Sequence, residues 1–270
     1  MTASVVYVYC VTPVGAATAE VATAPRGVEG APPRVITDRA SGATELAALV
    51  SDVPTSAYTP AAITAQAGDA TWLTPRAVAH DAVVTWASDR GAVVPLPMWV
   101  LFDDDAHVVT MLHERGAALR AALDRVTGAR EYGMRVSADA AALAAAAESL
   151  DPTLATLERE AAAASPGQAY LMRRKLDEAR KIARRDAAER IARAVHDTLA
   201  PVARATVPRV VTQATPQPDV LLNASYLVSD DMLDAFRAAV TLLLERFGAS
   251  GVRFDFTGPW PPYNFVRADD

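Results

Sequence analysis

The amino-acid sequence predicts an α+β protein of two domains. Short runs rich in β-branched and aromatic residues alternate with longer segments in which apolar residues recur at helical spacing, which indicates both strands and helices. This alternation occurs twice along the chain, and Gly128 lies between the two cycles. A length of 270 residues also suits two hydrophobic cores better than one.

The first cycle opens with a β-branched and aromatic run that ends before Pro13 and predicts a strand over Ser4–Thr12. Thr74 followed by proline predicts the N-cap and first turn of a helix that reaches Asp89. The segment Thr44–Val53 is expected to be a strand, although its leucine and alanine content also permits a helix. The other expected elements are strands over Arg34–Thr37, Ala92–Leu96 and Met98–Phe102 and a helix over Ala106–Val126.

The second cycle repeats this pattern with additional helices. Ser229 and the two aspartates after it predict a capped helix that ends before Gly248. The other expected elements are strands over Glu131–Ser137, Val202–Val211, Val220–Val228 and Val252–Phe256 and helices over Ala138–Leu150, Pro152–Ala164 and Gln168–Leu199.

Each cycle fits a four-stranded antiparallel sheet with helices on one face, which is a ferredoxin-like arrangement. We therefore expect an N-terminal ferredoxin-like domain over residues 1–127. A modified ferredoxin-like α+β domain, with a long basic helix, is expected over residues 128–270.

Composition narrows the classes of function. A formal net charge of −6 and a pI near 5.3 argue against a general nucleic-acid-binding protein, which would carry a basic surface. Cys10 is the only cysteine, so neither an internal disulfide nor a zinc site built from cysteines is expected. No signal peptide and no apolar run of membrane-spanning length is recognisable, so we expect a cytoplasmic protein that does not contact membranes.

The predicted helix over Gln168–Leu199 carries the densest positive charge. Its bases flank an apolar stripe, and acid–base pairs such as Asp186 with Arg190 occur at i,i+4 spacing. A solvated helix surface is one interpretation, and a docking surface for an acidic or amphipathic partner is the other. The residues that would contribute to such a surface are Tyr170, Arg173, Arg174, Lys175, Arg180 and Arg184.

No catalytic, cofactor-binding or metal-binding residue is predicted. The sequence lacks nucleophile-elbow, phosphate-loop and dinucleotide-binding motifs, which favours a non-enzymatic protein. Asp103, Asp104 and Asp105 lie beside His107 and could in principle bind a divalent cation. Their place between a strand and a helix favours capping of that helix instead.

The segment Thr257–Val266, here called the C-terminal clasp, concentrates prolines and aromatic residues. Its prolines exclude a helix and a central strand, and its aromatic rings need burial on the protein or on a partner. Both a structural role and a contact with a partner remain open for it. The clasp residues that would take either role are Gly258, Pro259, Trp260, Pro261, Pro262, Tyr263 and Phe265.

Five blocks in this sequence resemble the GvpF/GvpL family of gas vesicle accessory proteins. The most specific is the Gly-Pro-Trp-Pro-Pro-Tyr string within the C-terminal clasp. The other blocks occur in family order along the chain and are Val6–Val11, Val94–Met98, Gly167–Lys175 and Leu222–Val228.

The resemblance implies a two-domain, non-catalytic accessory protein located at the gas vesicle and in the cytoplasm. Such a protein would bind the small hydrophobic shell protein of the GvpA type, and other accessory proteins, during nucleation or growth of the vesicle. No cofactor, nucleic acid or membrane is implied, and self-association is left open. The alternative is a ferredoxin-like protein with a ligand-binding or enzymatic pocket between its helices and sheet, whose substrate the sequence does not reveal.

These observations predict that the clasp contributes more to stability or to partner binding than the basic helix does. Trp260→Ala is expected to lower thermal stability, or co-purification with the shell protein, more than Arg180→Ala does, because an indole ring buries more apolar surface than a solvated guanidinium. Thermal unfolding and affinity purification measure the two effects. Small and equal effects of both substitutions would show that the clasp is dispensable.

Overall fold

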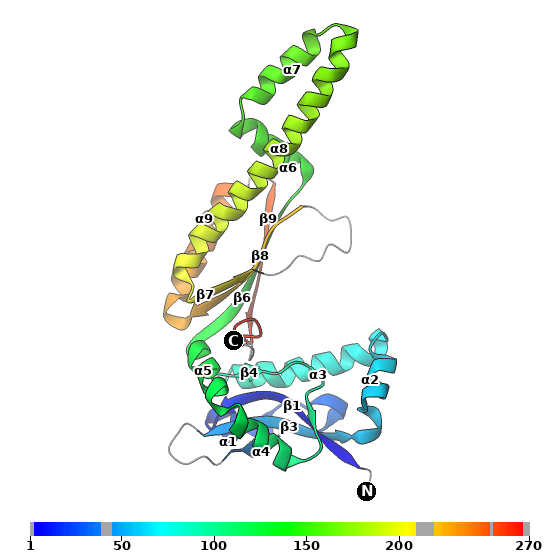
Figure 1. The fold of residues 1–270 in the computed structure, drawn as a ribbon. Helices are drawn as coiled ribbons and strands as arrows, with labels where there is room; N and C mark the ends of the chain where they lie inside the picture. The colour runs from blue at the N-terminus through cyan, green and yellow to red at the C-terminus, as the bar shows by residue number, and fades with distance from the viewer. Residues whose placement is uncertain (1–2, 39–44, 209–218, 249–250, 267–270) are drawn as a thin grey trace. The chain divides into compact units, whose positions relative to one another are not determined.

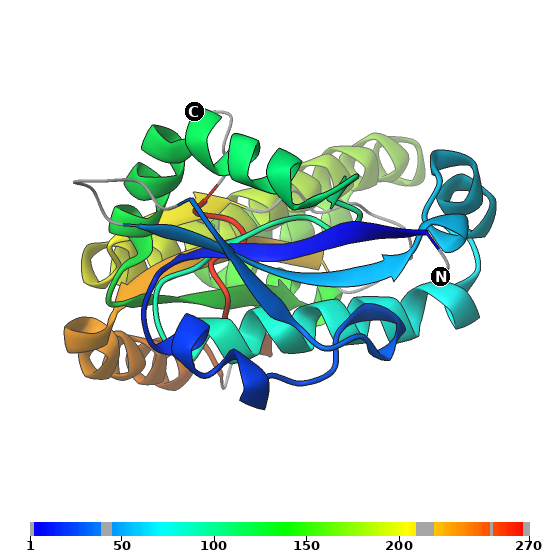
Figure 2. The ribbon, with the colours of Figure 1, turned by 90° about the horizontal axis from the view of Figure 1, so that it is seen from below.

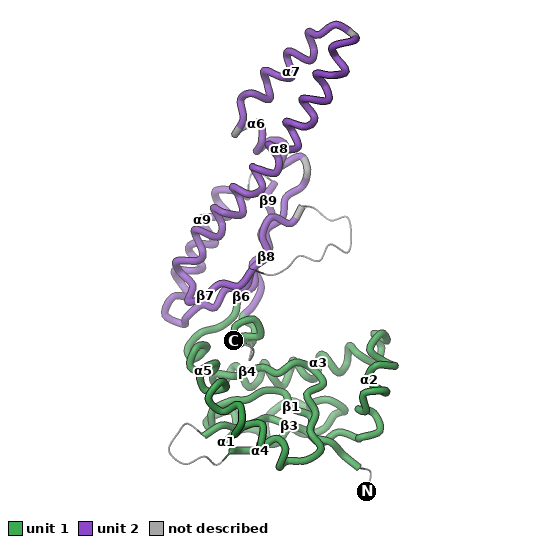
Figure 3. The backbone as a smooth tube through the Cα atoms, in the orientation of Figure 1, with its two compact units in different colours: residues 1–131, 259–270 green, residues 132–258 purple. Residues whose placement is uncertain are grey.

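The computed structural model describes residues 3–38, 45–208, 219–248 and 251–266 (Figure 1). These residues form a mixed structure of helices and two β-sheets, and the chain separates into two compact units (Figure 3). Unit 1 contains residues 1–131 and 259–270, and unit 2 contains residues 132–258. The chain therefore leaves unit 1 once and returns to it. The domain boundary expected after residue 127 stays a prediction, because compact packing does not test independent folding.

Unit 1 is built around a sheet with the strand order β2-β3-β1-β4, in which β5 also pairs with β1. The pairs that β1 forms with β3, β4 and β5 are antiparallel, as is the pair of β2 with β3. The strands are β1 (Ser4–Pro13), β2 (Arg34–Thr37), β3 (Leu46–Pro54), β4 (Val94–Pro95) and β5 (Leu101–Phe102). The α-helices are α1 (Ala16–Ala19), α2 (Pro60–Gln66), α3 (Ala70–Ser88), α4 (Asp105–Glu114) and α5 (Gly116–Val126).

Helices cover both faces of this sheet, whereas the sequence predicted helices on one face. Helix α3 packs against the face that carries Tyr7, Tyr9 and Leu49, and α4 and α5 lie on the opposite face (Figure 2). The cause is visible in β1, whose residues Tyr7–Val11 are all fully buried and therefore need apolar cover on both sides. A continuous apolar run, without strict alternation, is the sequence feature that indicates two covered faces.

An aromatic cluster fills the core between β1 and α3. The ring of Tyr7 lies 5.0 Å from that of Tyr9 and 5.7 Å from that of His80, and its hydroxyl is 2.9 Å from Nδ1 of His80. Trp99 contacts Tyr7 and has a φ of 73°, a left-handed conformation that costs a bulky residue free energy. The segment between β4 and β5 is therefore a loop, where the sequence predicted an extended strand.

Two helices of unit 1 differ from the sequence-based expectation. Helix α3 begins at Ala70, because the Asp69 side chain accepts a hydrogen bond from the backbone N–H of Thr71, and Pro75 lies inside the helix. The segment predicted as a single helix over Ala106–Val126 is divided at Arg115 into α4 and α5. Asp104 caps α4 by accepting a hydrogen bond from the backbone of His107, which confirms the capping interpretation of the aspartate run.

Unit 2 has the strand order β7-β8-β6-β9. When the strands of each unit are numbered along the chain, both sheets have the order second, third, first, fourth. The strands are β6 (Ala129–Ala138), β7 (Ala205–Pro208), β8 (Asp219–Ser229) and β9 (Val252–Trp260). The α-helices are α6 (Ala140–Leu150), α7 (Thr153–Ala163), α8 (Pro166–Leu199) and α9 (Leu233–Phe247).

Helix α8 takes part in two hydrophobic cores of unit 2. Its C-terminal half places Ile191 and Val195 against the sheet together with α9. Its N-terminal half packs Leu176, Ala183 and Ala187 against α6 and α7 (Figure 1). Leu171 and Ile182, two further apolar residues of α8, are exposed, because the shorter α6 and α7 cover only part of the circumference of α8.

The acid–base pairs expected on α8 at i,i+4 spacing are not those that form. Among the described residues of α8, Arg180 pairs with Asp177, and Arg185 pairs with Asp186 and with Glu189. The last of these pairs has i,i+4 spacing, with the base before the acid. Arginine is long enough to reach acids at several spacings, so the pattern of charges alone does not select the partner.

Burial of His80 predicts a pH dependence of stability. Burial lowers the pKa of His80 from 6.5 to about 4, and the backbone of Leu96 and the charge of Asp81 only partly oppose it. Between these values the unfolded chain binds a proton on His80 and the folded protein does not, so stability falls as the pH falls through this window, by about 3 kcal/mol in total. Well above pH 6.5 His80 is neutral in both the folded and the unfolded protein, so it no longer makes stability depend on pH.

Urea unfolding of the wild type and of His80→Gln tests this prediction. The stability difference between the two proteins should be constant above about pH 7 and should then shift in favour of His80→Gln as the pH approaches 4.5. A difference that does not change with pH would contradict a neutral, buried His80.

Candidate binding site

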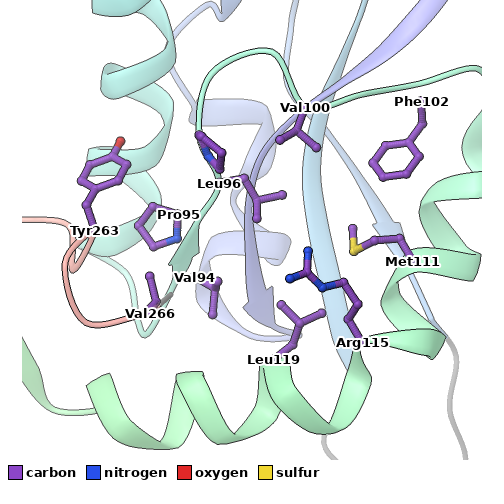
Figure 4. A pocket seen from close by; sticks show the side chains of 11 residues that line it. Val94, Pro95, Leu96, Val100, Phe102, Met111, Arg115, Leu119, Tyr263 and Val266 are labelled. Carbon is purple, nitrogen blue, oxygen red and sulfur yellow. The ribbon is translucent and has the colours of Figure 1, made fainter. Parts of the chain in front are cut away.

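A cavity of unit 1 lies beside its short edge strand β4. It has a volume of about 520 Å³, and its walls come from β4 and the loop after it, from α4 and α5, and from the C-terminal clasp (Figure 4). The side chains that line it are Val94, Pro95, Leu96, Pro97, Val100, Phe102, Met111, Arg115, Leu119, Tyr263 and Val266. A volume of this size is typical of a site that holds a small molecule or a few side chains of a partner.

Arg115 is the single charged residue among those lining side chains. It lies at the break between α4 and α5, and its guanidinium group points into the pocket between Met111 and Leu119 (Figure 4). Within the described part of the chain, the side chain of Arg115 makes no hydrogen bond and no ion pair. The pocket can therefore accept an apolar group together with an anionic one. Sequence reasoning missed Arg115, because it assigned this position to the middle of a continuous helix.

The C-terminal clasp completes the wall of the pocket. Pro261 and Pro262 are buried in unit 1, and Phe265 and Val266 are each only 5% exposed. Tyr263 lies at the rim of the pocket, and its hydroxyl donates a weak hydrogen bond of 3.4 Å to Asp81. Burial, reinforced by the negative charge of Asp81, raises the pKa of Tyr263. The tyrosine therefore stays neutral at physiological pH.

A buried carboxylate attaches the clasp to unit 1. Glu131 is 3% exposed, and it accepts hydrogen bonds from the backbone N–H of Asn264, at 3.0 Å, and from the side-chain amide of the same residue. Arg125 donates a further bond to the carbonyl oxygen of Phe265. Glu131 is the last residue of unit 1 before the chain enters unit 2, so the two parts of unit 1 are joined at this point.

The remaining clasp residues belong to the strand that precedes this attachment. Strand β9 continues through Gly258 and Pro259 to Trp260, beyond the end at Phe256 that the sequence predicted. Gly258 has a φ of 116°, which only glycine adopts without strain, so this position requires glycine. Trp260 is 47% exposed.

The basic residues predicted on α8 lie in unit 2, whereas the pocket belongs to unit 1. Tyr170 is 69% exposed, and Arg173, Arg174 and Lys175 are also exposed. Arg180 is half-buried and forms an ion pair with Glu158 of α7, while Arg184 is exposed. The structure therefore places the α8 residues in unit 2 and the clasp residues from Pro259 onward in unit 1, with Gly258 at the end of unit 2. Tyr263 of the clasp lines the pocket described above, whereas Arg180 and Arg184 line other cavities within unit 2.

The comparisons with known proteins agree with the resemblance seen in the sequence. The family described as "Gas vesicle synthesis protein GvpL/GvpF" matches residues 5–267. The chain belongs to the GvpL/GvpF family. No helix in the described part of this family member is both long and apolar enough to cross a membrane.

Relatives of both subtypes are similar to this GvpL/GvpF chain. Gas vesicle protein L of Streptomyces sp. (strain CB03234) is 31% identical over 243 residues, which cover 89% of this chain and 85% of that protein. Gas vesicle protein F of the same strain is 30% identical over 250 residues, which cover 88% of this chain and 90% of that protein. These identities are too close to each other to assign the chain to one subtype.

Solved structures of GvpF share the fold. The crystal structure of the gas vesicle protein GvpF from Anabaena sp. PCC7120 has a TM-score of 0.70 and 17% sequence identity over 98% of both chains. The GvpF structure from Microcystis aeruginosa has a TM-score of 0.64 and 16% identity over 97% of this chain and 99% of that one. At these identities the likeness concerns the fold alone.

The attachment of the clasp through Glu131 yields a prediction. Glu131→Gln keeps the size of the side chain but replaces an accepting oxygen with a donating NH₂ group, so one of its bonds to Asn264 is lost. We expect a loss of about 2 kcal/mol, because hydrogen bonds to a charged group contribute more than neutral ones.

Hydrogen exchange followed by mass spectrometry measures this effect. A peptide that covers residues 259–266 should exchange faster in Glu131→Gln, while the exposed control Glu114→Gln should match the wild type. Unchanged protection of that peptide would mean that the clasp is held by its apolar contacts alone.

Proposed function

We propose that this chain is a non-catalytic accessory protein of gas vesicle assembly. In this proposal it acts in the cytoplasm and at the gas vesicle, where it binds the small hydrophobic GvpA-type shell protein and other accessory proteins during nucleation and growth. The observation that carries the proposal is the family match, which extends over nearly the whole chain. An apolar subunit that assembles through strands needs partners that prevent premature edge-to-edge association.

The pocket of unit 1 is the surface that we assign to the shell protein. Its aliphatic and aromatic lining suits apolar side chains, and Arg115 suits a carboxylate beside them. Trp260 and Tyr263 are 47% and 36% exposed on the neighbouring clasp, and large aromatic residues of this kind are frequent anchors of interfaces. The exposed bases near the start of α8 are then available for a second, acidic partner.

We further infer that both units are variants of the ferredoxin-like fold. The shared strand order supports this inference, as do the helices α2 and α3 between β3 and β4 and the helix α9 between β8 and β9. The first connection of unit 1 departs from the pattern, because α1 has only four residues. The connection from β6 to β7 in unit 2 is instead longer than the pattern requires, because it contains the three helices α6, α7 and α8.

A second candidate function is the binding of a small ligand in the same pocket, with or without catalysis. The pocket volume of about 520 Å³ favours this alternative, since it would accommodate an apolar acid with its carboxylate on Arg115. A thermal-shift screen against metabolites and metal ions separates the two candidates. A clear stabilisation by a small molecule would favour the ligand-binding function.

The assignment of the pocket predicts the effect of reversing its charge. Arg115→Glu should reduce co-purification of the shell protein with the tagged chain about tenfold, which corresponds to about 1.4 kcal/mol. The matched control is Arg26→Glu, which changes an exposed arginine of the same unit by the same charge. If wild type and control bind the shell protein and Arg115→Glu binds equally well, the pocket is not the surface involved. If wild-type protein retains no shell protein, or a clean deletion leaves normal vesicles, the proposed function itself is wrong.

A further inference from the structure

Strand β9 is the long exposed edge of the second sheet. It pairs with β6 on one side and is the last strand in the sheet order, so no described strand pairs with its other side (Figure 1). The other edge strands are short, since β2 and β7 have four residues each and β4 has two. Strand β9 has nine residues, and its one proline, Pro259, lies beyond the proline-free segment Val252–Phe256. Short edge strands are a common protection against unwanted pairing, and a longer unpaired edge is a template for pairing with another strand.

The side chains of β9 alternate between the two faces of the sheet. Val252 and Phe254 pack on the core of unit 2, and Phe256 stacks on Tyr132 with 5.3 Å between the ring centroids. Arg253 and Asp255 therefore point to the opposite face. Both are exposed, and within the described part of the chain neither makes a hydrogen bond or an ion pair through its side chain.

We propose that β9 pairs in antiparallel fashion with β9 of a second copy of this chain, with Phe254 at the centre of the pairing. In this register Arg253 of each copy lies opposite Asp255 of the other, and two cross-strand ion pairs form. On the other face, Val252 of each copy lies opposite Phe256 of the other, and these apolar side chains continue the hydrophobic core of unit 2 across the pairing. A twofold axis perpendicular to the sheet relates the copies and keeps the helices of both on one face.

The charges select this register from its neighbours. Pairing centred on Arg253 would place two arginines directly opposite each other, and pairing centred on Asp255 would do the same with two aspartates. Pairing centred between two residues would place the inward side chains of one copy opposite the outward side chains of the other. A pattern that complements itself in this way points to a second copy as the occupant of the edge.

The contact extends over about five residues of each strand, so it buries less area than a stable dimer interface of roughly 1,200–2,000 Å². The dimer is therefore expected to be weak and to depend on concentration. It does not involve the pocket of unit 1, and the inference is independent of the proposed binding of the shell protein.

Charge exchange between the two positions tests the pairing. The full-length wild type, Arg253→Asp, Asp255→Arg and the double variant are compared by sedimentation velocity from micromolar to near-millimolar concentration. Each single variant places like charges opposite each other twice, and its dimer dissociation constant should rise about tenfold or more. The double variant restores both ion pairs with exchanged positions and should dimerise as the wild type does.

A mixture of the two single variants provides a sharper test. A chain with Arg253→Asp has two acids on this face and a chain with Asp255→Arg has two bases, so the mixture should form a heterodimer where each variant alone is monomeric. The control Arg190→Asp, an exposed site on α8, should leave dimerisation unchanged, and circular dichroism verifies that all variants are folded. A monomeric wild type at all concentrations overturns the proposal. The proposal is also overturned if the single charge reversals do not weaken the dimer. It is equally overturned if dimerisation is recovered neither in the double variant nor in the mixture of the two single variants.

Discussion

The burial of β1 on both faces is the constraint on which the first unit depends. Its central residues are inaccessible to solvent, and every apolar side chain on them needs a packing partner. On one face that partner is the aromatic cluster with α3, and on the other it is the pair α4 and α5. A register shift between Val8 and Cys10 lets Tyr9 turn into the cluster, where its hydroxyl accepts a bond from the backbone of Val28. This bond and the bond that Ser51 donates to the carbonyl of Pro32 help to hold the first connection, which has no long helix, against the sheet.

The repeated strand order shows how one arrangement can serve two purposes. In unit 1 the connections around the sheet are short or divided, and the gap between β4, the α4–α5 break and the clasp becomes a pocket. In unit 2 the connection after β6 is expanded into three helices that form a core of their own. The same order therefore yields a sheet with an apolar hollow beside it in one case and a sheet that carries a helical extension in the other.

Most strands and helices could be predicted from the sequence, because their patterns are local. The run of β1, the strand at Arg34–Thr37 and the helices of unit 2 each contain their own signal of period and composition. The division at Arg115 and the start of α3 at Asp69 could not be predicted with the same success. The position of each helix boundary depends on the packing around it, because several nearby residues could serve as the helix cap.

The candidate site was harder still to predict, since it is assembled from distant parts of the chain. The clasp was recognisable as an unusual segment, but nothing near it in the sequence indicates Glu131, which lies 133 residues away and holds Asn264. Similarly, Arg115 has no local pattern that distinguishes it from other surface arginines. Contacts of this kind arise from topology, which a periodic pattern does not encode.

The return of the chain to unit 1 has a consequence for biosynthesis. Domains generally fold in order as they leave the ribosome, yet residues 259–266 are translated only after the whole of unit 2. Until then the nascent first unit lacks Tyr263 and Val266, and the buried carboxylate of Glu131 has no donor from Asn264. The pocket is thus finished last, and a chain still attached to the ribosome does not present the surface that the released protein presents.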